Sequence, residues 1–471
     1  MSVEHVRGLD LHLDVGEGRG RGRALEAALR DAVRSGRLTP GTRLPGTRSL
    51  AADLGLSRGT VVQAFGQLVA EGWLVGVAGS GTVVGRVVGP TPATSVDGEP
   101  DRRSAPVAPR AEIDLRPGRP DLSAFPRTAW AGAVRRALAG STALLDYPAP
   151  AGLPELRAAL AEHVARTRGV RASPDAVVVT AGFTQALALL ARVVHGSGMR
   201  HAGVEDPSFA HHRHVLGAAG LAPVPLPVDG AGADPAALPA HAALALLTPA
   251  HQHPYGVVLA PARRTAIVEW ARRHDGFVVE DDYDGEFRYD RQPVGAMQPL
   301  DPDRVVFAGS ASKTLAPGMR LGWLVVPRAL RAPLESEMTA LGTRVPALDQ
   351  LALADLLARG EYDRHVRRMR LAYRARRHEL GDRLAAIGAP PPAGVAAGLH
   401  AVLPLDSAEH EHRTVAAAER AGVRVHGLHS GGYWHQPTPD RPGALVIGYA
   451  TPAAHAWRRA LDALTELLRP R

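Results

Sequence analysis

The feature that most constrains the fold is the segment at residues 89–111. It holds the run GPTPATSVDGEPDRRSAPVAPR, which is rich in Pro, Ser and Gly and shows no apolar periodicity. Such a composition is typical of a linker, because it offers no hydrophobic face to bury. The 471-residue chain is also longer than one hydrophobic core usually supports, about 250–300 residues. The sequence therefore predicts a domain at 10–88, a flexible linker at 89–111 and a second domain at 112–471.

Composition excludes several classes of protein. The chain has no Cys, which rules out disulfides, thiolate metal sites and cysteine nucleophiles. No apolar run approaches the roughly 20 residues that span a bilayer, and the first residues lack the pattern of a secretion signal. We therefore expect a cytoplasmic protein without a membrane segment. The HHRH run at 211–214 suggests a metal site, but no carboxylate or further His follows at ligand spacing, so we expect no metal.

The basic residues are almost all arginine. Lys313 is the only lysine among 55 basic residues, and the formal net charge is +8. Arg can replace Lys as a surface cation but not as a primary amine, so a single retained lysine suggests amine chemistry. On composition alone, survival by chance explains this lysine equally well.

Three helices and a hairpin are expected in the first domain. A first helix in RALEAALRDAVRSGRL has one apolar face. A second is expected in TRSLAADLG, capped by Thr47, and a third in SRGTVVQAFGQLVAEG, capped by Ser57, with Val61, Phe65 and Leu68 facing the core. The short turn between the last two predicts a helix-turn-helix. WLVGVAGSGTVV then predicts two strands with a Gly-rich tip, which is a wing.

The charge of this domain favours DNA as its partner. Between residues 19 and 88, ten arginines oppose four acidic residues. Arg48 begins the second predicted helix, and Ser57, Arg58 and Thr60 lie at the exposed start of the third, where they would face phosphates and base edges. Any one arginine is more often a solvated surface charge, so the prediction rests on the joint pattern.

The run GTRLPGTRSLAADLGLSRGTVVQAFGQLVAEGWL resembles the winged helix of GntR-type regulators. The resemblance implies DNA contacts by Arg48, Arg58 and Thr60, and by the wing tip near Gly79 and Gly81. Arg43 is a weaker candidate, and Gly59 stands where that family often has Thr.

In the second domain, short apolar runs alternate with helical patterns, which predicts an α/β fold with a mostly parallel sheet. Ligands of such sheets bind beyond the carboxyl ends of the strands. Five predicted strands end in chemically useful residues. The turn after AVVVT opens a helix at Gly182, Phe183 and Thr184, and the other ends carry Phe209, Thr248, Asp281 with Tyr283, and Ser310 with Ser312 and Lys313.

This set matches the needs of pyridoxal 5'-phosphate. A primary amine forms a Schiff base with its aldehyde, a carboxylate keeps the pyridine nitrogen protonated, and a phenol hydrogen-bonds the phenolate oxygen. The helix N–H groups near Gly182 to Thr184, Ser310 and Arg320 suit a phosphate. Each residue also has an ordinary structural explanation, such as core packing for Phe209; their order and the single lysine make that explanation weaker for the set.

These residues are similar to those of fold-type I aminotransferases, and specifically of the MocR branch of GntR regulators, where a winged helix precedes such a domain. The resemblance covers FPRTAW, VEDPSF, TPAHQHPYG, VEDDYDGEFRYD and GSASKTLAPGMRLGW. It implies that Lys313 is the Schiff-base lysine, Asp281 the pyridinium partner and Tyr283 the phenolate partner. It also implies that Ser310, Arg320 and the turn at Gly182, Phe183 and Thr184 hold the phosphate, and we count Ser312 among the cofactor-binding residues.

Two departures from the family pattern bear on catalysis. Phe209 stands where Tyr is common, which keeps stacking but loses a hydroxyl. Val446, in ALVIGYA, stands where aminotransferases place the arginine that binds the substrate α-carboxylate. A nearby residue such as Arg441 would then have to substitute. Efficient transamination of α-amino acids is therefore not expected.

The sequence thus predicts a transcriptional regulator that binds pyridoxal phosphate through Lys313 and responds to it, or to an amine or amino acid. A homodimer on double-stranded DNA with repeated half-sites is expected, since fold-type I sites usually lie between subunits. Two alternatives stay open. One is a working aminotransferase with a DNA-binding appendage, and the other is a cofactor-free dimerisation platform.

Overall fold

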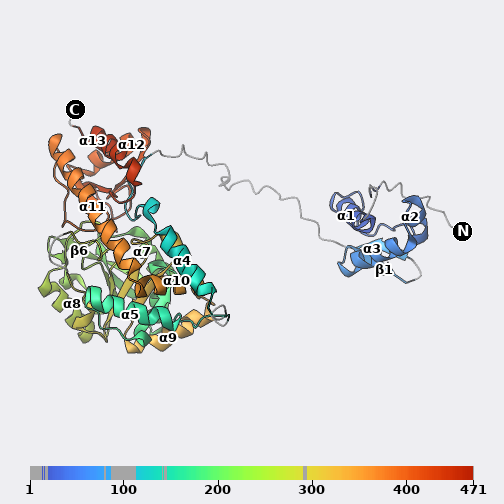
Figure 1. Cartoon of the computed structure of the whole chain (residues 1–471), viewed down its shortest axis with the longest axis horizontal. Helices are drawn as coiled ribbons and strands as arrows, with labels where there is room; N and C mark the ends of the chain where they lie inside the picture. Colours follow the sequence, from blue (N-terminus) through green and yellow to red (C-terminus); the bar gives the residue numbers. More distant parts are fainter. Residues whose placement is uncertain are drawn as a thin grey trace. The chain divides into compact units, whose positions relative to one another are not determined.

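The computed structural model describes residues 13, 15, 20–78, 81–85, 113–140, 142, 146–289 and 294–469. The chain forms two units, Met1–Ala105 and Pro106–Arg471 (Figure 1). The predicted linker at 89–111 lies outside the described residues. No helix among the described residues is long and apolar enough to cross a membrane.

The N-terminal unit is a three-helix winged helix. It comprises α1 (Arg21–Arg34), α2 (Thr47–Asp53), α3 (Arg58–Ala70) and an antiparallel hairpin of β1 (Leu74–Val77) and β2 (Gly81–Val84). Leu25 and Leu29 of α1 are buried against Val61, Phe65 and Leu68 of α3, as the apolar spacing predicts. This confirms the helix-turn-helix with its wing.

The helix starts agree only in part with the prediction. Ser57 caps α3, because its hydroxyl accepts a hydrogen bond from the Thr60 N–H at 3.1 Å. The predicted cap at Thr47 is wrong, since Gly46 holds the N-cap position of α2 and Thr47 is already helical. The chain enters α2 from Pro45 and Gly46 in an extended conformation, so the helix starts one residue early and without a side-chain cap.

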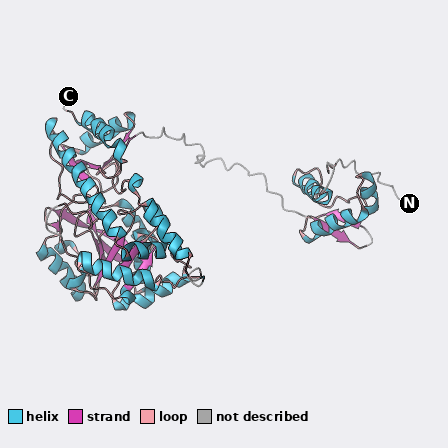
Figure 2. Cartoon of the chain, in the orientation of Figure 1, coloured by secondary structure: helices cyan, strands magenta, loops and turns pink. Residues whose placement is uncertain are grey.

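A mostly parallel sheet forms the centre of the C-terminal unit (Figure 2). Its strand order is β4-β11-β10-β9-β8-β5-β6-β7, with β11 antiparallel to both neighbours and β7 antiparallel to β6. The strands are β4 (Val177–Thr180), β5 (His201–Asp206), β6 (Ala222–Asp229), β7 (Gly232–Ala233), β8 (Ala242–Leu247), β9 (Phe277–Asp281), β10 (Val305–Ser310) and β11 (Gly322–Val325).

Helices cover both faces of this sheet. One face carries α6 (Phe183–Gly196), α7 (Ala210–Ala218) and α9 (Arg328–Ala340). The other carries α4 (Arg127–Leu138), α5 (Pro154–Arg168), α8 (Pro261–Arg273) and α10 (Ala347–Ala358). Strands buried on both faces are almost wholly apolar, which explains runs such as AALALL in β8. The arrangement confirms the predicted α/β fold.

A smaller subdomain follows the long helix α11 (Glu361–Ala386). It contains a sheet of β12 (Ala401–Leu405), β15 (Gly443–Ile447) and β14 (His426–Gly427), with α12 (Ala408–Arg420) and α13 (Trp457–Leu468). The first described strand of this unit, β3 (Ile113–Asp114), pairs in parallel with β13 (Val423–Arg424). The segment after β3 is therefore attached to the small subdomain before the chain enters the large one.

Candidate functional site

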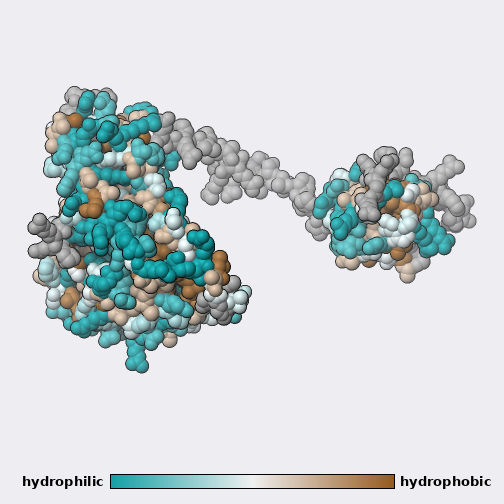
Figure 3. All heavy atoms as spheres, in the orientation of Figure 1, coloured by the Kyte–Doolittle hydropathy of each residue, from teal (hydrophilic) through white to brown (hydrophobic). Residues whose placement is uncertain are grey.

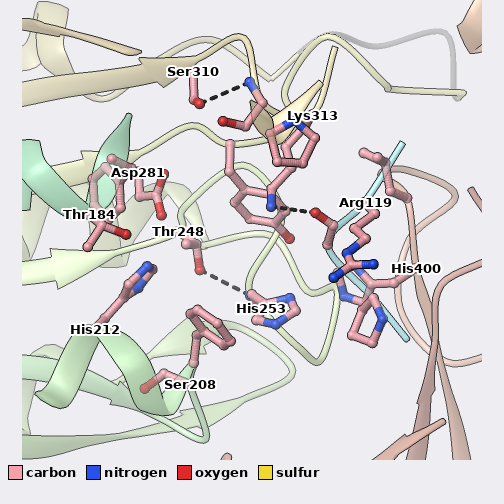
Figure 4. A pocket seen from close by; sticks show the side chains of 18 of the residues that line it. Arg119, Thr184, Ser208, His212, Thr248, His253, Asp281, Ser310, Lys313 and His400 are labelled. Carbon is pink, nitrogen blue, oxygen red and sulfur yellow. Dashed lines mark hydrogen bonds between the residues drawn. The ribbon is translucent and has the colours of Figure 1, made fainter. Parts of the chain in front are cut away.

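A pocket of about 320 Å³ lies at the carboxyl ends of the central strands (Figure 4). The strands β4, β5, β8, β9 and β10 run parallel, so their last residues meet at one edge of the sheet. Of the ten predicted cofactor-binding residues, nine line this pocket: Phe183, Thr184, Phe209, Asp281, Tyr283, Ser310, Ser312, Lys313 and Arg320. The tenth, Gly182, lies beside the Arg320 guanidinium.

Lys313 carries the amine of the pocket. Its Nζ donates a hydrogen bond of 2.7 Å to the carbonyl oxygen of Gly118, which lies in the segment that follows β3. Burial lowers the pKa of the Lys313 ammonium, and the nearby Asp281 carboxylate opposes that shift. Burial therefore favours the neutral amine, which is the nucleophilic form.

Asp281 is the last residue of β9 and is buried at the pocket. Burial raises the pKa of its carboxyl well above the usual value, and the positive charge of Lys313 opposes the rise. A carboxyl in this position would stay ionised when a cation is bound beside it, since an opposite charge favours the charged form.

Tyr283 is oriented by a buried hydrogen-bond network. Its hydroxyl donates to the backbone carbonyl of His251 at 3.0 Å and lies 3.1 Å from the Nδ1 atom of the same residue. The His251 ring is in turn held by the Asp284 carboxylate at 2.7 Å. Burial raises the pKa of the Tyr283 hydroxyl, so it keeps its proton.

An anion cradle forms where α6 begins. Gly182 has φ 89° and ψ 171°, a conformation almost reserved for glycine, and a Cβ there would lie 3.4 Å from Arg320 Nη1. A Cβ on Gly322 would come within 2.9 Å of the Gly182 Cα, so Gly322 lets its strand approach the turn closely. The first N–H groups of a helix have no intrahelical partners and suit an anion, and α6 begins directly after Gly182.

The pocket also contains residues that the sequence reasoning did not single out. Burial lowers the pKa of His212 and of His400 to about 3, so these imidazoles are neutral. His253 lies within the quoted TPAHQHPYG run, and its buried Nδ1 atom has no hydrogen-bond partner among the described residues. Thr248, which the sequence placed at a strand end, also lines the pocket. Further lining residues are Pro117, Gly118, Arg119, Val204, Glu205, Ser208, Leu246, Pro317, Leu399, His426 and Tyr433.

The expectation for Arg441 is wrong. Val446 is fully buried in the small sheet, where it lies opposite His426 and Val402, so it presents no charge to a ligand. Arg441 does not line the pocket, because its guanidinium lies 3.3 Å from Asp206 and over the Trp434 ring. Arg119 lines the pocket instead, beside His400 and across from Asp281 and Thr184 (Figure 4).

Groups that could bind a metal are few among the described residues. In the HHRH run, His212 faces the pocket, whereas His211 and His214 are exposed. His251, Asp284 and His400 do place ligand atoms within 4.8 Å of one another. In this cluster His251 is hydrogen-bonded to Asp284, and the His400 ring donates to the Pro254 carbonyl.

The predicted DNA-contacting residues of the N-terminal unit are accessible. Arg48, Ser57 and Arg58 are exposed and Thr60 is half-buried, with its hydroxyl 2.8 Å from that of Ser57. Gly81 begins β2 with φ 88°, and a Cβ there would lie 3.7 Å from the Arg43 side chain. Gly79 lies outside the described residues.

Comparison with known proteins identifies the family. Residues 22–84 match the bacterial regulatory proteins of the gntR family, and residues 112–464 match aminotransferase class I and II. The pyridoxine biosynthesis transcriptional regulator PdxR of Corynebacterium glutamicum is 35% identical over 91% of both chains. The chain belongs to the MocR/PdxR type of GntR regulators. The probable rhizopine catabolism regulatory protein MocR of Rhizobium meliloti is 34% identical over 94% of this chain and 92% of its own.

Solved structures agree on the fold of the second unit of this MocR-type regulator. An archaeal alanine:glyoxylate aminotransferase has a TM-score of 0.68 at 24% identity and covers 75% of this chain and 90% of its own. The kynurenine aminotransferase of Pyrococcus horikoshii has a TM-score of 0.67 at 22% identity, covering 76% and 90%. At this identity the likeness shows the fold of the domain.

The anion cradle yields a stability prediction. Gly182→Ala should lower the free energy of unfolding by about 1–3 kcal/mol, because a side chain must adopt a strained backbone conformation. The matched control is Gly196→Ala at the other end of α6, where a Cβ meets open space. Denaturant unfolding of both variants checks the prediction, which fails if Gly182→Ala is as stable as Gly196→Ala.

Glu205 yields a pH prediction. Burial raises the pKa of Glu205 to about 7, against hydrogen bonds from Thr248. The folded protein therefore holds the Glu205 proton more tightly than the unfolded chain does. This stabilises the fold fully below the unfolded pKa, near 4.5, and the stabilisation is lost as the pH rises through the folded pKa of about 7. Between about pH 5 and pH 8, the free energy of unfolding of the wild type should therefore fall by about 3 kcal/mol more than that of Glu205→Gln.

The control for this prediction is Glu269→Gln, at an exposed position of α8. Denaturant unfolding at the two pH values should give the wild-type pH dependence for this control. An unchanged pH dependence in Glu205→Gln would show that Glu205 is not the titrating group.

Proposed function

We propose that this MocR-type regulator binds pyridoxal 5'-phosphate at Lys313 and couples that binding to its affinity for DNA. The observation that carries the proposal is the pocket itself, which holds a buried amine, a buried carboxylate, an oriented phenol and an arginine-backed glycine turn. The aminotransferase class I and II family to which residues 112–464 belong typically binds this cofactor, which supports the proposal further.

The residues present fit the group. The Arg320 guanidinium lies beside the Gly182 turn where α6 begins, and a phosphate bound there would also be near Ser310 and Thr184, which line the same pocket. Asp281 would pair with the ring nitrogen and Tyr283 would hydrogen-bond the ring oxygen, while Phe209 would stack on the ring. When bound, the cofactor supplies an aldehyde carbon that condenses reversibly with primary amines.

The residues at the substrate end of the pocket favour ligand sensing over transamination of α-amino acids. Val446 provides no cation that could anchor an α-carboxylate, and the residue opposite it is His426, whose pKa is lowered by burial. Arg119 is then the cation at the effector end, and its only described ion pair is a long one of 3.6 Å with Asp114, which is already bound by Arg116. We propose that an effector amine carrying an acidic group binds through Arg119.

A homodimer in the bacterial cytoplasm is part of the proposal. Two winged helices would read repeated half-sites on double-stranded DNA, with Arg48, Arg58 and Thr60 at the groove and Gly81 beside the wing. The C-terminal unit leaves the Tyr147 side chain 89% exposed and Leu138 55% exposed, which supports a further interface. Ligand binding would change the spacing of the paired winged helices through the linker at 89–111.

Lys313→Ala tests the cofactor role. Pyridoxal phosphate should change the affinity or footprint of the wild type on the promoter of its own or an adjacent gene, in a gel shift and footprinting assay. The variant should bind the same DNA without any response to the cofactor, because it lacks the amine. The wild type, but not Lys313→Ala, should also show a visible absorbance band with the cofactor.

Several outcomes would contradict this function. Identical spectra for the two proteins would remove Lys313 from the site. Sustained conversion of amino acids with release of keto acids would favour the aminotransferase alternative, and the absence of any cofactor band would favour a cofactor-free dimerisation platform.

Arg119→Gln tests the effector end. In spectral titrations of the cofactor-loaded protein, this variant should bind an amino acid about tenfold more weakly, because one charge-assisted hydrogen-bond pair is lost. Its affinity for a simple amine of similar length should not change. Arg441→Gln is the control, since Arg441 does not line the pocket. Equal losses for the acid and the simple amine would show that Arg119 does not select the acidic group.

A further inference from the structure

A second cavity, of about 420 Å³, lies between the end of α5 and the first half of α11. The turn after β9 completes its wall. α5 and α11 are both in view in Figure 1, and hydrophilic side chains predominate on that face (Figure 3). The charged residues that line it include Arg166, Arg168, Glu286, Arg288, Arg367 and Arg370.

Positive charge exceeds negative charge around this cavity. Five arginines line it, against the carboxylates of Glu286 and Asp363 on the wall and Asp282 behind it. Two of the arginines are already neutralised. Arg168 is buried in a two-bond pair with Asp282 at 2.7 and 2.9 Å, and Arg166 lies 2.7 Å from Asp363.

Arg367 and Arg370 are not neutralised by the described residues. They lie one helical turn apart on α11, and both are exposed at the mouth of the cavity. Arg370 Nε donates to the backbone carbonyl of Glu286 at 2.7 Å, which orients its guanidinium without cancelling the charge. Like charges at this spacing repel each other, so an anion between them would stabilise the helix.

The inner wall of the cavity connects to the first pocket. The buried Tyr362 hydroxyl donates to the Thr314 hydroxyl at 2.9 Å, and Thr314 directly follows Lys313 in the sequence. The His163 ring packs edge-on against Tyr362 and is only 4% exposed, with Asp363 and Glu286 within 4.0 Å. A ligand in this cavity would therefore contact residues that hold the turn containing the amine.

We propose that this cavity is a second anion site, which takes a small phosphate-bearing molecule through Arg367 and Arg370. Guanidinium groups match phosphate oxygens in paired hydrogen bonds. Of the two here, Arg370 is oriented by the Glu286 carbonyl, and neither has an ion-pair partner among the described residues. The cavity has walls on α5, α11 and the turn after β9, so its size suits a small molecule better than a DNA backbone. This proposal does not depend on pyridoxal phosphate binding at Lys313.

The test uses inorganic pyrophosphate as the probe, with the full-length protein in isothermal titration calorimetry at constant ionic strength. The wild type should bind pyrophosphate. Arg367→Gln/Arg370→Gln should weaken that binding about tenfold or more, since two charge-assisted contacts are lost. Arg364→Gln is the matched control, because Arg364 lies on the same helix, pairs with Glu361 and does not line the cavity.

Two further variants separate the possible sites. Arg320→Gln removes the arginine beside the Gly182 turn of the first pocket and should leave the pyrophosphate affinity of the second cavity unchanged. Arg367→Lys/Arg370→Lys keeps the charge and should retain part of the affinity. The proposal is overturned if pyrophosphate does not bind, if the double Gln variant binds as the wild type does, or if Arg320→Gln alone abolishes binding. A loss of affinity for duplex DNA without loss of pyrophosphate binding would assign the two arginines to DNA instead.

Discussion

The C-terminal unit depends on keeping two groups of opposite charge out of water at the ends of neighbouring strands. Asp281 ends β9, and Lys313 follows β10, whose residues pair with those of β9 in parallel register. Burial alone would neutralise both groups, and each partly restores the charge of the other. The nearby buried carboxyl groups of Glu205, Asp282 and Asp284 raise the pKa of Asp281 further, so many titratable groups lie in and around the pocket. Such clusters are expected where a protein binds a reactive ligand.

The sequence was sufficient to predict the elements that lie next to these groups. Strand ends, glycine turns and the residues after them are local features, so Asp281, Tyr283, Ser310 and Lys313 could be placed on one edge from the sequence alone. The wing and the recognition helix were predicted for the same reason, because their apolar spacing and the Ser57 cap are written within a few residues. The cap at Thr47 failed because side-chain preference was overridden by the extended entry through Pro45 and Gly46.

The rest of the pocket could not be predicted, because distant parts of the chain supply it. His400 and His426 come from the small subdomain. His400 directly precedes the five-residue strand β12, and His426 lies in a two-residue strand, so neither position carries a periodic signal. Arg119 follows a short irregular segment, and nothing in its surroundings distinguishes it from the many other arginines. The failure of Arg441 has the same origin, since its pairing with Asp206 joins residues more than two hundred positions apart.

The segment after β3 has a mechanical consequence. Its start is fixed to the small subdomain by β13 and by the Thr451 hydroxyl, which donates to the Arg116 carbonyl at 2.7 Å. Its Gly118 carbonyl is fixed to the large subdomain by the Lys313 amine. The strand β3, which follows the predicted linker, thus pairs with the small subdomain, whereas Lys313 belongs to the large one. A reaction at the Lys313 nitrogen would remove one of the hydrogen bonds that hold this segment to the large subdomain, while contacts such as those of Arg213 with the Tyr433 and Trp434 carbonyls would remain.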